Sequence, residues 1–379
     1  MQIAIITYCR REDGHPGGVP KWAWYLKRAL EESAQVENRC GVPPEVEQES
    51  ESAQVGNLRH QPQIGNPAGG SGQVRCHVQV GHYAWRDYPG WQRCDRLPEH
   101  EKARLLSEHL AGTGPDRARQ GWAQCPAPLR DYDHIIADGF WASGLPDDAP
   151  ATVVCHGTWA GLAAACGGVA RELIDAQGEA YRRFPVVAVS RAAARQVERY
   201  HGVRVAAIIP NGVDLGVFRP AERSANRPPV ALYAGKGYGK GEDIVREVAR
   251  ELHGKVRVEY LNAAIGMEAR AFQRGDVFLF PSRHEGDSYA LKEALACGLP
   301  VVASAVGALE DERPPEIGEV VEGFAPEDYC AAMWRVLVNR EAYQPRAWAE
   351  RNADYREFAR RWREYLADGA RANRPAAET

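Results

Sequence analysis

The chain has 379 residues, enough for two ordinary domains, and its 44% hydrophobic and 26% charged residues are typical of a globular protein. A net charge of −4 supplies no overall positive field, which argues against a dedicated nucleic-acid binder and leaves only a local basic groove open. Nine scattered cysteines, an odd number, predict reduced thiols in a cytoplasmic protein. We expect neither a membrane span nor a signal peptide, because no apolar run approaches about 18 residues and no basic residue precedes the first one.

The N-terminal half alternates short apolar runs with amphipathic segments. Strands are predicted at 2–7, 74–80, 133–138, 151–155, 185–190 and 205–209. Helices are predicted at 20–32, 97–110 and 191–200. The first strand, the glycine-rich loop after it and the first helix form the usual opening of a Rossmann-like unit.

Residues 33–73 have a different composition from the rest of this half. They are rich in Gln, Glu, Ser, Gly and Pro, and the pentamer Glu-Ser-Ala-Gln-Val begins at Glu32 and again at Glu51. Two polar copies are too few for a repeat architecture. The composition predicts a mobile polar insertion, with a lid over an acceptor site as the alternative.

A second alternating series follows a proline-rich stretch near 210–228. Strands are predicted at 230–234, 256–261, 277–280 and 300–303. Helices are predicted at 242–252, 288–296, 326–338 and 347–366. The sequence therefore predicts an α/β protein with two parallel-sheet domains, at 1–210 and 211–346, and a C-terminal helical segment at 347–379.

The strongest candidate site lies between the predicted strand at 277–280 and the helix after it. Glu285 and Gly286 occupy the turn, and the helix begins near Ser288. Free N–H groups at a helix start attract an anion. Glu293 follows Glu285 by eight residues, about two helical turns, so both carboxylates can line one cleft.

The segment from Glu285 to Glu293 resembles the E-x7-E region of retaining glycosyltransferases of family 4, the glycosyl transferases group 1 type, which have the GT-B fold. That fold has two Rossmann-like domains facing across a cleft and a C-terminal helix that crosses back to the N-terminal domain. Residues 33–130 match nothing in the family pattern. Four other segments are similar to family motifs: Gly17-Gly18, Cys155-His156-Gly157, Asn211-Gly-Val-Asp214, and Gly235-Lys236 with Lys240-Gly241.

The resemblance implies a role for each matching side chain. Glu285 is expected to hydrogen-bond the donor sugar, and Glu293 the ribose hydroxyls. Lys236 and Lys240 are expected to neutralise the donor diphosphate, whose charge grows as the nucleotide leaves. His156 is expected to lie near the sugar and the attacking hydroxyl.

The resemblance also assigns backbone roles and shows departures from the pattern. Glycines let the loops approach the phosphates closely, and backbone N–H groups at the start of the helix join the phosphate contacts. These backbone positions are Gly17, Gly18, Gly235, Gly286, Asp287, Ser288 and Tyr289. Lys236 stands where the family commonly has Arg, Asp287 where an aromatic residue is frequent, and Ser288 where Gly or Pro is usual.

The implied function is retaining transfer of a hexose from a UDP- or GDP-sugar to an acceptor hydroxyl, with closure of the domains on the donor. No metal and no cofactor are expected. The acceptor is a small molecule, a glycan or a lipid-linked precursor, and peripheral attachment to a membrane stays open. A nucleic-acid acceptor is disfavoured.

Other interpretations of the same residues stay open. The enzyme could be a nucleotide-sugar 2-epimerase, or the chain could be a silent nucleotide-sugar-binding protein. Glu285 could serve only as a helix cap and Glu293 as a solvated carboxylate. His156 could be a satisfied core histidine, and Lys236 and Lys240 ordinary surface lysines.

Overall fold

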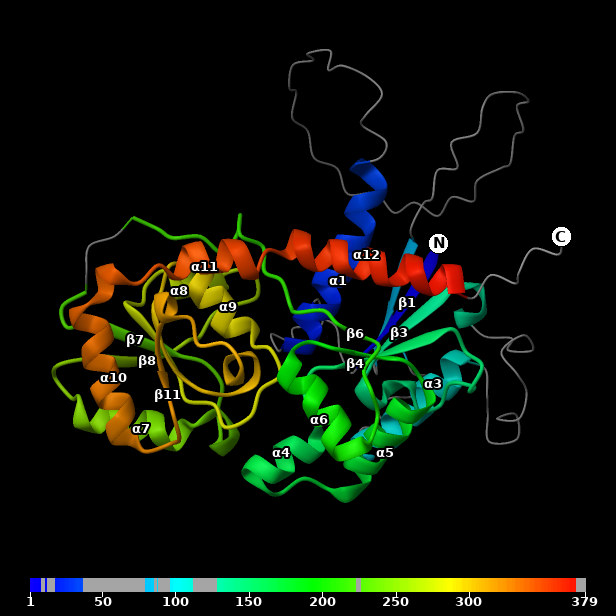
Figure 1. The fold of residues 1–379 in the computed structure, drawn as a ribbon, viewed down its shortest axis with the longest axis horizontal. Coiled ribbons are helices and arrows are strands. Elements are labelled where there is room, and N and C mark those ends of the chain that lie inside the picture. Colours follow the sequence, from blue (N-terminus) through cyan, green and yellow to red (C-terminus); the bar gives the residue numbers. More distant parts are fainter. Residues whose placement is uncertain are drawn as a thin grey trace, which may run out of the picture.

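A computed structural model of the protein describes residues 1–7, 11, 18–36, 79–84, 87, 96–111, 128–222 and 226–372. In this part of the chain, strands and helices alternate through two halves that lie side by side, each with its own sheet (Figure 1). The predicted α/β class is confirmed. The described residues contain no helix long and apolar enough to cross a membrane.

The N-terminal half is built on a six-stranded parallel sheet with the order β2-β1-β3-β4-β5-β6. Its inner strands β1, β3, β4 and β5 are apolar and mostly buried, as expected for a parallel sheet covered by helices. The strands are β1 (Gln2–Ile6), β2 (Gln79–Tyr83), β3 (His134–Asp138), β4 (Ala151–Cys155), β5 (Val186–Ala188) and β6 (Ala207–Ile208). The helices are α1 (Gly18–Val36), α3 (Glu99–Ala111), α4 (Trp159–Cys166), α5 (Arg171–Arg183) and α6 (Arg191–His201), with the 3-10 turns η4 (Pro128–Asp131) and η5 (Gly139–Ala142).

The C-terminal half has a five-stranded parallel sheet with the order β11-β10-β9-β7-β8. The strands are β7 (Val230–Tyr233), β8 (Arg257–Tyr260), β9 (Val277–Phe280), β10 (Val301–Ser304) and β11 (Gly318–Val321). The helices are α7 (Glu242–Glu251), α8 (Glu268–Phe272), α9 (Tyr289–Ala296), α10 (Pro326–Val338), α11 (Pro345–Asn352) and α12 (Tyr355–Ala372). The 3-10 turns are η6 (Tyr238–Lys240), η7 (Gly307–Glu310), η8 (Pro315–Ile317) and η9 (Arg340–Ala342).

In both sheets the first strand of the half lies between the second and the third. The strand order therefore reverses between β1 and β3 in one sheet and between β7 and β9 in the other. Ligands of open α/β sheets bind outside the carboxyl ends of the strands at such a reversal. The loops that leave β7 and β9 are the ones that carry Lys240 and Glu285.

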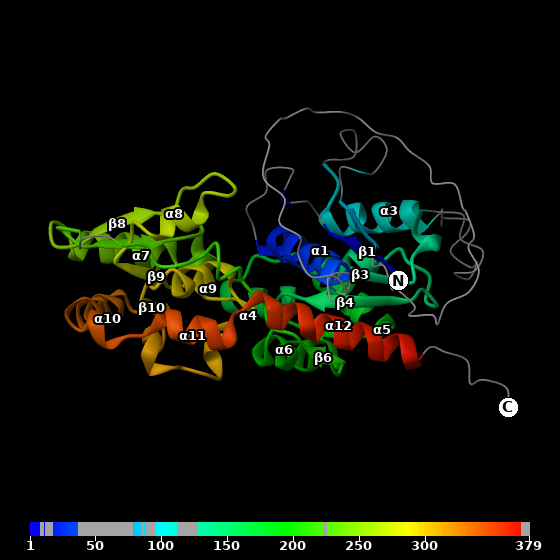
Figure 2. The same ribbon diagram turned by 90° about the horizontal axis from the view of Figure 1, so that it is seen from above.

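The chain returns to the N-terminal half at its C-terminal end (Figure 2). The predicted helix at 347–366 is in fact two helices, because the backbone of the segment between the halves intervenes at their junction. Val213 N donates to Ala353 O at 2.8 Å, and Tyr355 N donates to Val213 O at 3.1 Å. Beyond this break α12 packs against α1, with Trp362 and Trp22 both fully buried.

Other departures from the sequence-based prediction are local. Helices α4, α5 and α8 and strand β11 were not predicted, and α1 extends through residues 33–36 of the supposed insertion. Residues 37–73 and most of the predicted strand at 74–80 lie outside the described residues. α5 was missed because Gln177 and Gly178 lie on its buried face, so the sequence lacks the helical spacing of apolar residues that predicts a helix.

Candidate functional site

The loops at the two reversal points face each other and enclose connected cavities. The inner cavity, of about 360 Å³, is bordered by Gly18 and His156 of the N-terminal half and by Gly235, Lys240 and the loop from Glu285 to Ala290. The aromatic cavity, of about 640 Å³, extends from Lys240 and Glu285 into the N-terminal half. The structure thus brings most of the predicted site residues to one cleft.

Glu285 and Lys240 form an ion pair at the mouth of both cavities. Lys240 Nζ lies 2.5 Å from Glu285 Oε1, and the side chains are 42% and 13% exposed. Gly235 makes this approach possible, because its φ is +91° and an added Cβ would lie 2.8 Å from Lys240 Cγ. The two residues are therefore available together to a ligand that enters the cleft.

Lys236 is oriented differently from Lys240. Its exposed side chain extends over the ring of Tyr260, with Nζ 4.9 Å from the ring centroid. It borders the aromatic cavity but not the inner cavity. A contact between Lys236 and a bound diphosphate stays a prediction, and it requires the side chain to leave Tyr260.

Glu293 is buried and is held by a lysine from the other half of the molecule. Lys21 Nζ donates to both carboxylate oxygens, at 2.6 and 2.7 Å, and both side chains are less than 10% exposed. Burial raises the pKa of Glu293, and the nearby Lys21 charge opposes that rise. Glu293 is therefore no solvated surface carboxylate. Its predicted contact with a ribose is untested.

Lys21 is a candidate site residue that the sequence analysis missed. It lies on α1, three residues after Gly18, and it borders the inner cavity. No local signal marks it, because its partner is 272 residues away in the sequence. The inner cavity is therefore bordered by two lysines, Lys21 and Lys240.

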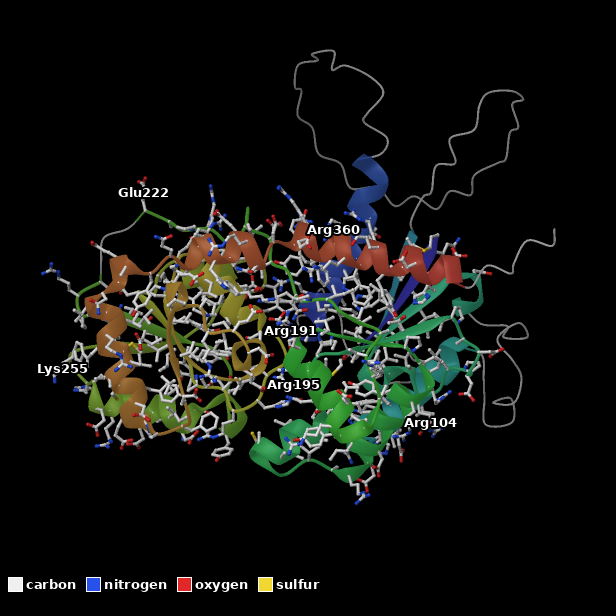
Figure 3. The ribbon with its side chains drawn as sticks, in the orientation of Figure 1. Arg104, Arg191, Arg195, Glu222, Lys255 and Arg360 are labelled. Carbon is white, nitrogen blue, oxygen red and sulfur yellow. The ribbon has the colours of Figure 1, made fainter. Side chains whose placement is uncertain are left out.

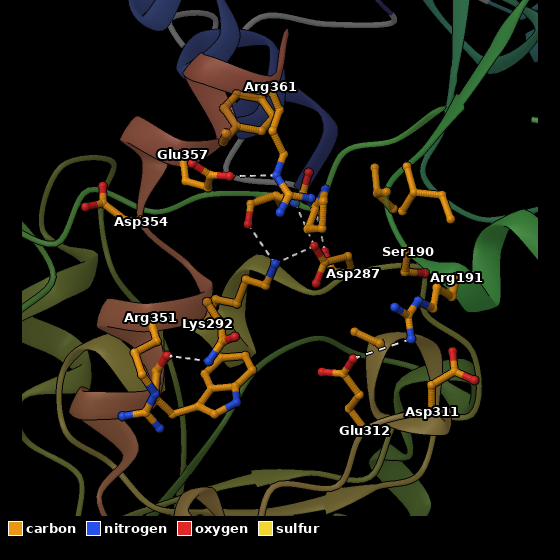
Figure 4. Close-up of a pocket in the computed structure, with 18 residues that line it drawn as sticks. Ser190, Arg191, Asp287, Lys292, Asp311, Glu312, Arg351, Asp354, Glu357 and Arg361 are labelled. Atoms are coloured by element: carbon orange, nitrogen blue, oxygen red, sulfur yellow. Dashed lines mark hydrogen bonds and ion pairs between the residues drawn. The ribbon is translucent and has the colours of Figure 1, made fainter. Parts of the chain in front are cut away.

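Asp287, which departs from the family pattern, connects the loop to the segment between the halves (Figure 4). Its Oδ2 accepts from Lys292 Nζ at 2.5 Å and from Asn211 N at 2.7 Å. Lys292 Nζ also donates to Asn211 O at 2.6 Å, and Asn211 Nδ2 donates to Asp287 O at 2.7 Å. This buried cluster fixes the loop position, so the carboxylate of Asp287 is engaged with protein groups.

A third cavity of about 450 Å³ lies on the other side of this cluster, and Asp287 and Asn211 border both it and the inner cavity. Charged side chains around it pair with one another. Arg361 Nε lies 2.8 Å from Glu357 Oε1, and Arg191 lies 3.8 Å from Glu312 (Figure 4). Nearby, Arg195 joins the halves through Asp311 and Glu310, at 2.6 and 3.0 Å; Figure 3 shows it beside Arg191 on α6.

The N-terminus of α9 faces the inner cavity. Ser288 caps it by accepting from Leu291 N at 3.4 Å, and Tyr289 and Ala290 border the cavity. The first N–H groups of a helix have no partner within the helix and attract anions. Gly286 allows this end to approach the other half, because an added Cβ would lie 2.1 Å from His156 O.

His156 lies at the junction of the two cavities and is not a satisfied core histidine. Its buried Nε2 has no hydrogen-bond partner among the described residues, and its ring contacts Trp22 edge-on at 4.8 Å. Burial lowers its pKa to about 3, so the imidazole is neutral at physiological pH. Asp138 Oδ1 lies 3.9 Å from Nε2, and burial raises the pKa of Asp138 to about 7.

The remaining predicted residues are the two N-terminal glycines. Gly17 lies outside the described residues. Gly18 borders both cavities, and an added Cβ would meet only Tyr289 Cδ2, at 3.9 Å. No contact with the described residues therefore requires a glycine at position 18. The predicted close approach of Gly18 to a phosphate stays untested.

The described residues contain no group of three or more His, Cys, Asp or Glu side chains that could hold a metal ion. Cys155 and Cys297 are free and buried, and burial raises their pKa values to about 11 and about 12. Metal independence and a cytoplasmic location both stay predictions. These two thiols are packing residues, because an unreactive protonated thiol is what such burial favours.

Comparison with solved structures identifies the fold. Sucrose-phosphate synthase from Thermosynechococcus elongatus matches 98% of this chain and 100% of its own with a TM-score of 0.65 and 14% identity. HepE of Anabaena, solved in complex with UDP and glucose, matches 97% of this chain and 99% of its own with a TM-score of 0.63 and 14% identity. The chain has the GT-B fold of glycosyltransferases.

Comparison of sequences gives a family match over part of the chain. Residues 221–339 match the family model described as Glycosyl transferases group 1, which agrees with the resemblance over this segment. D-inositol 3-phosphate glycosyltransferase of Geodermatophilus obscurus is 30% identical over 39% of this chain and 44% of its own length. The enzyme of the same name from Mycobacterium tuberculosis is 32% identical over 37% of each chain. The matches thus span less than half the length of these relatives.

Proposed function

We propose that this protein is a retaining glycosyltransferase that moves a hexose from a nucleotide diphosphate sugar to an acceptor hydroxyl. The observation that carries the proposal is the inner cavity, where Lys240, Glu285 and the N-terminus of α9 meet. A cation beside a helix N-terminus suits a diphosphate, and a carboxylate beside both suits the hydroxyls of a sugar. The complex of HepE with UDP and glucose supports UDP as the nucleotide.

Each candidate site residue has a part in the proposed reaction. Lys240 and the first N–H groups of α9 bind the diphosphate and stabilise the charge that develops on it. Glu285, released from Lys240, accepts hydrogen bonds from the sugar. Glu293 binds the ribose, and the charge of Lys21 opposes the rise that burial causes in the pKa of this carboxyl. His156, neutral and with Nε2 unpartnered among the described residues, faces the sugar and the acceptor.

The proposed chemistry is a displacement on one face of the sugar. The bond between the anomeric carbon and the diphosphate oxygen breaks, and a bond from that carbon to the acceptor oxygen forms on the same face. The proton of the acceptor hydroxyl passes to the leaving phosphate oxygen. We expect closure of the halves to exclude water from the activated sugar, and we expect no metal ion to be needed.

The test is nucleotide release by the purified full-length chain with UDP-glucose, other UDP-hexoses and GDP-hexoses. Glu285→Gln and Lys240→Ala should each lower turnover by about 100-fold, because each removes a contact that strengthens in the transition state. Lys255→Ala is the matched control, since Lys255 is exposed in the turn after α7, beside Trp334. Full turnover by both site variants would show that the site assignment is wrong.

The same assay separates the alternatives. Conversion of the free donor with no acceptor present would indicate a 2-epimerase, and donor binding without turnover on any acceptor would indicate a silent binding protein. Retention is read from the anomeric proton coupling of the product. An unchanged rate in EDTA would support metal independence.

A further inference from the structure

The aromatic cavity has a chemistry of its own on the N-terminal side. Phe140 and Trp141 of η5 follow the end of β3, and Trp159 opens α4 after β4. The centroid of Phe140 lies 6.0 Å from that of Trp141 and 6.4 Å from that of Trp159. Leu162, one turn further along α4, borders the same space. The N-terminal side of this cavity is therefore rich in aromatic residues, of which Phe140 and Trp141 are almost fully buried and Trp159 is half-buried.

The acidic groups on this wall have no cationic counterpart from the same half that borders the cavity, among the described residues. Asp138 and Glu99 border the cavity, and Glu99 is held by Lys102 at 3.1 Å. Asp138 is 17% exposed, and its basic neighbour is Nε2 of the neutral His156, at 3.9 Å. Among the described residues of the N-terminal half, no lysine or arginine borders this cavity.

The lysines of this cavity come from the C-terminal half and have other partners. Lys240 is paired with Glu285, and Lys236 extends over Tyr260. In the proposed function both belong to the donor diphosphate. A second phosphate, carried by the acceptor, would therefore enter an apolar space with Asp138 beside it and no spare cation among the described residues. Burying an unpaired charge in this way is costly.

An uncharged ring suits the same wall. Trp159 offers flat apolar surface to the apolar face of a ring, while Asp138, whose side chain is 17% exposed, can accept from a hydroxyl at the ring edge. A cavity of about 640 Å³ is of the size that holds a small organic molecule. We propose that the acceptor is an uncharged hydroxylated ring compound and that the cavity rejects its phosphorylated counterpart. The identification of this compound as the acceptor rests on the proposed function.

The experiment measures binding to the full-length chain saturated with UDP, so that it does not depend on turnover. The probes are phenyl β-D-glucoside with its 6-phosphate, and myo-inositol with its 3-phosphate, titrated by calorimetry or ligand-observed NMR. In each pair the phosphate should bind at least about 10-fold more weakly, because its charge has no partner in the cavity. Failure of the neutral glucoside to bind, or tighter binding by the phosphates, overturns the proposal.

Variants place the binding in this cavity. Trp159→Ala should weaken phenyl glucoside binding by about 10-fold, since it removes aromatic contact area. Trp334→Ala is the matched control, because Trp334 is 39% exposed on α10 and does not border the cavity. Asp138→Asn should keep the fold and reduce the difference in affinity between each neutral ring compound and its phosphate. Equal effects of the two tryptophan variants would contradict the assignment to this cavity.

Failure of this inference about the acceptor can be distinguished from failure of the proposed function. UDP binding is titrated separately in the inner cavity, and Lys240→Ala should weaken it. Absence of UDP binding would contradict the proposed function. The ring titrations, repeated without nucleotide, would then still decide whether the cavity prefers the neutral compound.

Discussion

Lys21 and Glu293 connect the two halves through an ion pair with almost no exposure to water. Such a pair loses hydration on both sides and is stable only while both partners are present, since either charge alone would be buried without compensation. Glu293 already has a raised pKa with Lys21 in place. The pair therefore ties α1 of the N-terminal half to α9 of the C-terminal half.

We expect Lys21→Met to destabilise the protein by about 3 kcal/mol, because Glu293 would be left buried without a cation. Adding Glu293→Gln to it should recover most of that loss, since the uncompensated charge is then removed as well. Lys27→Met is the control: its pair with Glu31 is half exposed, and its loss should cost less than about 0.5 kcal/mol. Urea unfolding measures all of these. Equal losses at positions 21 and 27 would disprove this account of the pair.

At the scale of elements, the loop between β9 and α9 is fixed by close backbone contacts. Gly286 lies against the carbonyl group of His156, so close that an added Cβ would lie 2.1 Å from that oxygen. Ser288 then caps α9, and Asp287 secures the loop to Asn211. The position of Glu285 in the cleft therefore depends on a contact between the loops that follow β9 and β4.

We expect Gly286→Ala to force these two loops apart, costing about 2 kcal/mol of stability. Turnover should fall by about 100-fold, because a shift of about 1 Å misplaces Glu285 and the start of α9. Gly254→Ala separates the two effects, since it lies in a remote turn with φ of +76° and open space around it. It should cost about 1 kcal/mol and keep full turnover. Nucleotide release and thermal unfolding are measured on both, and normal turnover by Gly286→Ala would contradict the role of this contact.

At the scale of the whole molecule, the chain passes twice between the halves. The segment from Ile208 to Val230 is the first passage, and the junction of α11 and α12 is the second. The two passages are hydrogen-bonded to each other through Val213, next to Ala353 and Tyr355. This arrangement makes α12 part of the N-terminal half. If the halves move relative to each other, the chain must bend at these two crossings.

We expect Trp362→Ala to destabilise the N-terminal half by about 4 kcal/mol, as for other fully buried large aromatic residues. Its ring lies 6.0 Å from that of Trp22, between α12 and α1, with no exposed surface. Arg363→Ala, the neighbouring exposed position, should change stability by less than about 0.5 kcal/mol. Urea unfolding followed by tryptophan fluorescence tests both, and a small effect at position 362 would show that α12 is not part of this core.

Part of the site could be predicted because it follows from local pattern. Glu285 and Lys240 each follow a strand, and the carboxyl ends of parallel strands meet at one edge, so their loops had to lie close together. His156, which follows β4, was expected through the resemblance to the family motif. Lys21 and Asp138 could not be found, because what distinguishes them is a partner or a cavity contributed by distant parts of the chain.

The sequence by itself determined the class of fold, the alternation of strands and helices, and the family motif, since all three are written in the spacing of neighbouring residues. It misjudged the last helix as continuous, because the interruption at Ala353 comes from a backbone more than a hundred residues earlier in the chain. Only the tertiary structure decided that Glu293 is buried on Lys21, that Asp287 secures the loop to Asn211, and that the aromatic cavity carries carboxylates but no cation on its described N-terminal wall. The physical reason is that burial and pairing are properties of surfaces brought together from both halves, and no single segment of the sequence encodes them.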